Sequence, residues 1–198
     1  MLHLFGPLEA SGGGMSLLYG MSLYARWLFA LLVWQREKPR TRIWLAETLW
    51  PDYPPEDEEK RSANFRQQLR TLRHALGKEV SRLSEWDNLA APALSLDLTG
   101  AYVDVFAFER AYRRATSAAG TLSGLEGVVR LYRGEFLEGY QAPWVEEPRR
   151  RFQEYYLDAL ERLAAGTLAA GDAAQAEQWL RQAVETDRFR ESAVRQLL

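Results

Sequence analysis

Basic side chains are concentrated between residues 60 and 82, and their chemistry suits a phosphate backbone. This stretch holds seven lysines and arginines against one acid, Glu79, although the 198-residue chain has a net charge of −2. Lys and Arg neutralise phosphates, and Arg, Asn, Gln and Thr side chains also hydrogen-bond to base edges in the major groove. A local basic cluster in a mildly acidic chain therefore indicates DNA binding at one surface rather than indiscriminate binding of polyanions.

A helix over residues 60–76 is predicted to position these side chains. Phe65, Leu69, Leu72 and Leu76 recur at spacings of four, three and four, which places them on one core-facing side. On and beside the opposite face lie the residues that we predict to meet bases: Asn64, Gln67, Arg70, Thr71 and His74. Phosphate contacts are predicted for the basic residues nearer the core edge and at the helix starts: Arg66, Arg73, Lys60, Arg61, Arg40 and Arg42.

Simpler interpretations of the same residues stay open. An arginine-rich helix is often only a solvated face. Asn64 suits capping or bracing as well as adenine recognition, and His74 suits an ordinary surface position. Five tryptophans lie within apolar helical patterns, which favours a place in the core over a ligand cage: Trp27, Trp44, Trp50, Trp144 and Trp179.

An acidic segment, residues 52–59, precedes the basic helix. It carries five carboxylates and no base, and Pro54 and Pro55 stiffen it. DNA phosphates would repel these carboxylates, so we expect the segment to point away from a duplex. It is then either a solvated turn or a contact for a basic protein surface.

The elements around the basic helix predict a winged helix-turn-helix over residues 1–99. Short apolar pieces broken by glycines in residues 1–20 indicate small strands. Helices are expected over residues 22–34 and from a cap at Thr41 to Pro51. Alternating residues 94–98 indicate a hairpin after the basic helix, and its tip lacks Lys and Arg.

Helix follows helix in residues 100–198, which predicts an all-α second domain. Helices are expected over these stretches: 103–118, 122–132, 144–169, 173–185 and onward from Arg190. Small and apolar residues between Leu160 and Ala183 have the spacing of a tetratricopeptide-like helix pair. The fold class is therefore mostly α with a small β component. We expect this second domain to be incomplete at its C-terminus, as part of a longer protein, or to be completed by a partner.

Several function classes find no support in the residues. There is no cysteine, and the two histidines lack ligand spacing, so no metal site is predicted. Neither a phosphate-binding loop nor a nucleophile elbow is present, so we expect no catalytic residues, no cofactor and no enzyme. The run 23–34 is too short to span a bilayer and no signal peptide is apparent, which favours a cytoplasmic protein without membrane contact.

Specific sequence blocks resemble a known family. LAETLWP at 45–51, ANFRQQL at 63–69 and LRHALG at 72–77 resemble the winged helix of bacterial SARP-type transcriptional activators. VDVFAFE at 103–109 and LYRGEFL at 131–137 are similar to the bacterial transcriptional activator domain that follows it. Both blocks occur in the order that this family has, and together they span nearly the whole chain.

The resemblance implies an OmpR-like domain whose third helix enters the major groove of direct repeats near a promoter. It implies a helical module that supports regulation or a possible homodimer. It also implies that the acidic segment faces RNA polymerase, with the contact made by Asp57, Glu58 and Glu59. The competing hypothesis is a protein–protein scaffold whose winged helix no longer binds DNA.

Overall fold

The computed structural model describes residues 1–198 apart from 87–90, 189, 191, 194 and 196–198. Its first part begins with a three-stranded antiparallel sheet in the order β1-β2-β3. Three helices follow. The strands and helices of this part have these bounds: β1 Leu2–His3, β2 Glu9–Gly12, β3 Met15–Ser16, α1 Leu23–Trp34, α2 Arg42–Leu49 and α3 Glu58–Leu76.

A hairpin, here called the wing, completes the winged helix-turn-helix. It consists of β5, Leu83–Trp86, and β6, Ala93–Leu96. A short strand β4, Arg40–Thr41, pairs with β6 and gives the sheet order β4-β6-β5. The sequence predicted the hairpin but no strand between the first two helices, where β4 lies. The predicted wing tip lies partly outside the described residues.

Local signals set most helix ends in this part. The side chains of Ser22 and Thr41 accept hydrogen bonds from Ala25 N and Trp44 N, each at 3.2 Å. Gly77 ends α3 with φ +50°, a conformation that favours glycine. The expectation of an acidic loop through residue 59 was wrong, because α3 already begins at Glu58. Carboxylates in the first turn of a helix interact favourably with its dipole.

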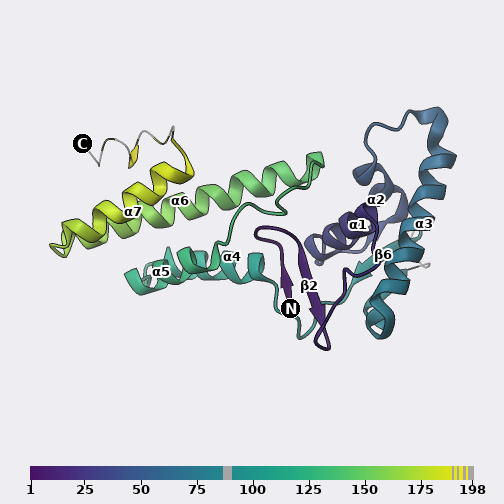
Figure 1. The fold of residues 1–198 in the computed structure, drawn as a ribbon, viewed down its shortest axis with the longest axis horizontal. Helices are drawn as coiled ribbons and strands as arrows, with labels where there is room; N and C mark the ends of the chain where they lie inside the picture. The colour runs from purple at the N-terminus through teal and green to yellow at the C-terminus, as the bar shows by residue number, and fades with distance from the viewer. Residues whose placement is uncertain (87–90, 189, 191, 194, 196–198) are drawn as a thin grey trace.

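The second part is helical, as predicted. Its helices are α4 Asp104–Ala115, α5 Leu122–Leu131, α6 Glu146–Ala169 and α7 Ala173–Thr186. Helices α6 and α7 pack along each other (Figure 1), and Leu160, Leu163 and Ala183 are buried between them as the tetratricopeptide-like spacing predicts. The helix expected from Arg190 falls largely outside the described residues. Among the described residues, no helix has both the length and the apolarity needed to cross a membrane.

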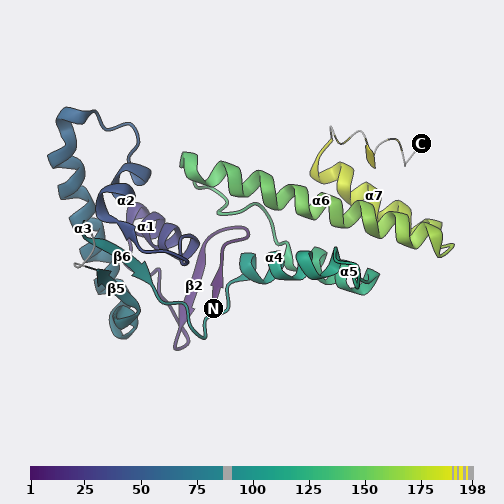
Figure 2. The same ribbon diagram turned by 180° about the vertical axis from the view of Figure 1, so that it is seen from behind.

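The N-terminal strands lie between the winged helix and the helical part in both views (Figures 1 and 2). The ring of Phe5 lies 5.2 Å from Phe108 and 5.3 Å from Phe152. The Asp104 carboxylate, 1% exposed, accepts hydrogen bonds from Leu4 N at 2.8 Å and Phe5 N at 3.2 Å. The first residues of the chain are thus part of the core around α4 and α6, so contacts cross the predicted boundary between residues 99 and 100.

Candidate nucleic-acid interface

Helix α3 presents a solvent-facing stripe opposite its core side. Phe65, Leu69, Leu72 and Leu76 are buried, which confirms the predicted core side. The opposite side exposes Ala63 and a run of longer polar residues: Arg66, Gln67, Arg70 and His74. Helix α3 packs on α1 and α2 through its apolar side, so the stripe is held on a rigid element.

Two residues predicted to meet bases are engaged elsewhere. Asn64 is half-buried, and its Nδ2 donates a hydrogen bond of 2.7 Å to the Tyr53 hydroxyl. This contact braces α3 against the preceding segment, which was the alternative role for Asn64. The Thr71 hydroxyl donates to the carbonyl oxygen of Gln67 at 3.2 Å. The Thr71 hydroxyl proton is therefore used within α3, and the Asn64 side chain is held toward Tyr53.

The remaining predicted readers stay at the surface. Arg70 Nη1 donates to Gln67 Oε1 at 3.1 Å, which links two neighbouring exposed side chains. His74 is exposed, and no side-chain hydrogen bond holds it within the described part of the chain. Arg66, predicted to contact phosphate, is exposed and has no hydrogen bond or ion pair with any described residue. These four residues could all meet a DNA groove without breaking a core contact.

A carboxylate that sequence reasoning missed joins α2, α3 and the wing. Glu85 on β5 accepts hydrogen bonds from both Arg42 and Arg73. One negative charge therefore offsets two predicted phosphate contacts and holds both guanidinium groups in place. Strand alternation is the available signal, since Leu83 is buried and Glu85 shares its side of β5.

Other predicted phosphate contacts are also paired. Lys60 Nζ lies 2.6 Å from Asp57 Oδ1, and the hydrogen bond to Asp57 raises the pKa of the Lys60 ammonium. Arg61 Nη2 lies 3.5 Å from Glu47 Oε1. Arg40 donates to Gln35 Oε1 at 2.6 Å, and its guanidinium carbon lies 4.7 Å from the Trp44 ring centroid. The Lys60 pair is exposed and therefore weak, so a phosphate can compete for this ammonium group, whereas the Arg61 side chain is only 13% exposed.

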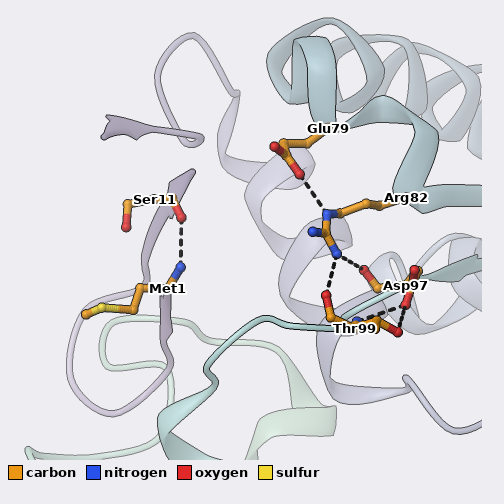
Figure 3. Close-up of polar contacts among 6 residues, drawn as sticks. All are labelled: Met1, Ser11, Glu79, Arg82, Asp97 and Thr99. Atoms are coloured by element: carbon orange, nitrogen blue, oxygen red, sulfur yellow. Dashed lines mark hydrogen bonds and ion pairs between the residues drawn. The ribbon is translucent and has the colours of Figure 1, made fainter. Parts of the chain in front are cut away.

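Arg82, the last residue of the basic stretch, has a structural role (Figure 3). Its Nε donates to Glu79 Oε2 at 2.7 Å, and its Nη1 donates to the carbonyl oxygens of Asp97 at 3.3 Å and Thr99 at 2.9 Å. The Thr99 hydroxyl and amide donate to the Asp97 carboxylate and hold the pKa of Asp97 below its ordinary value. Arg82 thereby fixes the segment after α3 to the connection that leads into the helical part.

On the acidic segment, Asp52, Glu56, Glu58 and Glu59 are exposed, whereas Asp57 is half-buried beside Lys60. Within the described residues, no group of three or more His, Asp or Glu side chains is placed to hold a metal ion. Of the five tryptophans assigned to the core, Trp50 is buried, and the other four are half-buried and pack against the core.

Comparisons with known proteins agree with this architecture. Residues 103–198 match the family model of the bacterial transcriptional activator domain. The fold matches a structure of Mycobacterium tuberculosis EmbR in complex with a low affinity phosphopeptide, with a TM-score of 0.78 and 22% sequence identity. The match covers 99% of this chain but only 52% of the EmbR chain. The comparison with curated proteins found no match.

The family match covers the helical half, and the structural match extends the likeness to the winged helix in front of it. Both comparisons thus agree with the resemblance to SARP-type transcriptional activators: residues 103–198 match the model of the bacterial transcriptional activator domain, and the chain as a whole shares the fold of the EmbR structure.

Proposed function

We propose that the chain is a sequence-specific DNA-binding transcriptional activator that reads promoter direct repeats with α3. The observation that carries the proposal is the exposed stripe of Arg66, Gln67, Arg70 and His74 on a helix whose other side is buried. The runner-up function is a protein–protein scaffold. A solvent-facing stripe of base-reading side chains, with Arg42 and Arg73 fixed beside it by Glu85, supports DNA binding over the scaffold.

The test separates base contacts from phosphate contacts. A cognate site is first selected from random double-stranded DNA with the intact chain. Arg70→Ala is expected to cost about 1 to 3 kcal/mol on this site and to relax the preference at one base pair. Lys78→Ala, at an exposed residue just after α3, should weaken binding to all sequences about equally.

Arg114→Ala is the matched control, because Arg114 is an exposed arginine on α4, away from α3. It should leave affinity and preference unchanged. Identical profiles for Arg70→Ala and Lys78→Ala across a set of mutated sites would contradict this orientation of α3. Absence of any selected sequence would favour the scaffold.

Pairing of two chains on direct repeats would fall to the helical half. On each helix of this half, α4 to α7, an arginine is paired with an acid of the same helix (Arg113, Arg130, Arg162 and Arg181), so the part of this half would be to bring a second winged helix to the DNA. Linked contacts raise affinity because the second binding event becomes intramolecular.

The exposed acids at the start of α3 are proposed to contact RNA polymerase. Glu58 and Glu59 suit this role better than Asp57, which is engaged with Lys60. Glu58→Gln together with Glu59→Gln should leave operator affinity intact or raise it, since two charges that repel phosphate are lost. Transcription from the target promoter in a purified system should fall several-fold.

The control for that experiment is Glu126→Gln, a neutralised surface acid on α5 that pairs with Arg130. It should change neither measurement. If transcription followed DNA occupancy in every variant, the acidic segment would be a solvated turn without a partner.

A further inference from the structure

A groove with a volume of about 640 Å³ lies on the back of the wing, between the wing and the helical half. Its walls come from the turn after α1, strands β5 and β6, the connection 97–101 and helix α4. Pockets of about 300 to 1,000 Å³ hold small-molecule ligands. The groove is therefore large enough for a ligand that touches both parts of the chain.

The groove is separate from the candidate DNA interface. Side chains alternate along β5, so Ser84 and Trp86 point to the face opposite Leu83 and Glu85. Glu85 contacts Arg73 of α3, whereas Ser84 and Trp86 line the groove. A ligand in the groove would leave the stripe of α3 free.

Two arginines in the groove lack a full counter-charge. The Arg36 guanidinium carbon lies 3.2 Å from the centroid of the Phe106 ring, and its ion pair with Glu37 is long at 3.9 Å. Arg110 is exposed and makes no hydrogen bond or ion pair to the described residues. Burial lowers the pKa of Arg36, and the nearby positive charge of Arg110 lowers it further, against the opposing effect of Glu37 and Glu109. An anion between the two arginines would relieve their repulsion.

The acids in the lining do not occupy this position. The Asp97 carboxylate accepts both hydrogen bonds from Thr99, and the Glu37 side chain is 82% exposed to solvent. The arginines are thus the charged groups available to a ligand inside the groove.

Trp86 supplies a ring surface in the same groove. Trp86 is 40% exposed, and its Nε1 donates a hydrogen bond of 2.9 Å to Ser95 Oγ, which fixes the indole. An exposed tryptophan offers a stacking surface to a planar ring, as aromatic side chains do to nucleic-acid bases. The Ser84 hydroxyl adds a polar group to the lining.

We propose that this groove binds a small anion that carries an aromatic ring, of the nucleotide class, with its ring on Trp86 and its phosphate at Arg36 and Arg110. Such a ligand would connect the wing to α4 and hold the two halves of the chain together. The inference goes beyond the proposed function and does not depend on DNA binding.

Calorimetry on the intact chain without DNA tests the proposal. The probes are the four ribonucleoside 5′-monophosphates, the matching nucleosides and inorganic phosphate. At least one monophosphate should bind saturably, and its nucleoside and inorganic phosphate should each bind about tenfold more weakly or worse. Arg110→Ala should weaken the nucleotide about tenfold or more, because a charge-assisted contact is lost.

Trp86→Ala should also cost about tenfold, and Trp86→Phe, which keeps an aromatic ring and the hairpin packing, should retain most of the affinity. Arg114→Ala on the same helix α4 should bind like the unmodified chain, and so should Arg70→Ala on α3. The proposal is overturned if none of the four nucleotides binds or if inorganic phosphate binds as tightly as a nucleotide. Loss of binding in Arg70→Ala but not in Arg110→Ala would place the nucleotide on the DNA face and would equally overturn it.

Discussion

Replacing Asp104 by alanine is expected to lower the free energy of unfolding by about 3 to 5 kcal/mol, because buried backbone amides lose their hydrogen-bond acceptor. The carboxylate is 1% exposed and accepts from the amides of Leu4, Phe5 and Val105. Leu4 and Phe5 are themselves buried, so no water can replace the lost acceptor without opening the core. His3 Nδ1 lies 3.4 Å from the same carboxylate without a hydrogen bond to it.

Urea unfolding followed by tryptophan fluorescence and circular dichroism would measure this loss. Asp104→Asn keeps one acceptor oxygen, so its free energy of unfolding should lie between those of the unmodified chain and the alanine variant. Glu126→Ala, at an exposed acid, should change stability by less than about 0.5 kcal/mol. A change below about 1 kcal/mol in Asp104→Ala would show that Leu4 and Phe5 are not anchored by this residue.

The same experiment reports on how the halves cooperate. Leu4 and Phe5, directly after β1, contact α4 and α6, and β1 pairs with β2 of the N-terminal sheet beside the winged helix. Loss of the Asp104 anchor should therefore destabilise both halves in one transition. Two separated transitions would show that the boundary predicted at residues 99 and 100 divides independent folding units.

Sequence reasoning succeeded where the signal was local. Apolar spacing gave the buried side of α3, a threonine before an apolar run gave the start of α2, and a glycine gave the end of α3. These features depend on residues within about one or two helical turns of each other, so one chain suffices to read them. The helical second half was predictable for the same reason.

Pairings between distant segments could not be predicted in this way. Strand β4 has two residues, and it forms only because Arg40 and Thr41 meet Leu94 and Ala93 from the wing. Contacts of the candidate site are likewise non-local: Asn64 meets Tyr53, and Glu85 meets both Arg42 and Arg73. A helical wheel gives the direction of a side chain but not its partner, which is why Asn64 was assigned to the DNA face.

The salt dependence of DNA binding should report these ion pairs directly. Four of the seven basic residues between positions 60 and 82 have acidic partners: Lys60, Arg61, Arg73 and Arg82. Arg66, Arg70 and Lys78 do not, and Arg42 and Arg73 together exceed the charge of Glu85 by one. Since Arg70 is assigned to a base, about three phosphates are neutralised by Arg66, Lys78 and this excess charge, so the slope of log K against log salt should be about −2 to −3.

This slope corresponds to a loss of about 16- to 64-fold in affinity between 50 and 200 mM salt. Fluorescence anisotropy on the selected site over that range gives the slope. A response flatter than about −1 would contradict phosphate binding by this face, whereas a slope steeper than about −6 would mean that phosphate displaces the acids from every pair.

A variant at Glu85 tests how much the ion pairs with Arg42 and Arg73 reduce the contribution of these two arginines to DNA binding. Glu85→Gln removes the charge that offsets Arg42 and Arg73, while the amide oxygen still accepts from one of them. Non-specific affinity at low salt should therefore rise, and the slope should become more negative by about one. Glu79→Gln is the matched control, since Glu79 holds Arg82 against the connection and not against the α3 stripe. If Glu85→Gln instead lowered affinity on every sequence with an unchanged slope, then Glu85 would serve to orient Arg42 and Arg73. The fixed orientation of the two guanidinium groups would then matter more to DNA binding than the negative charge of Glu85.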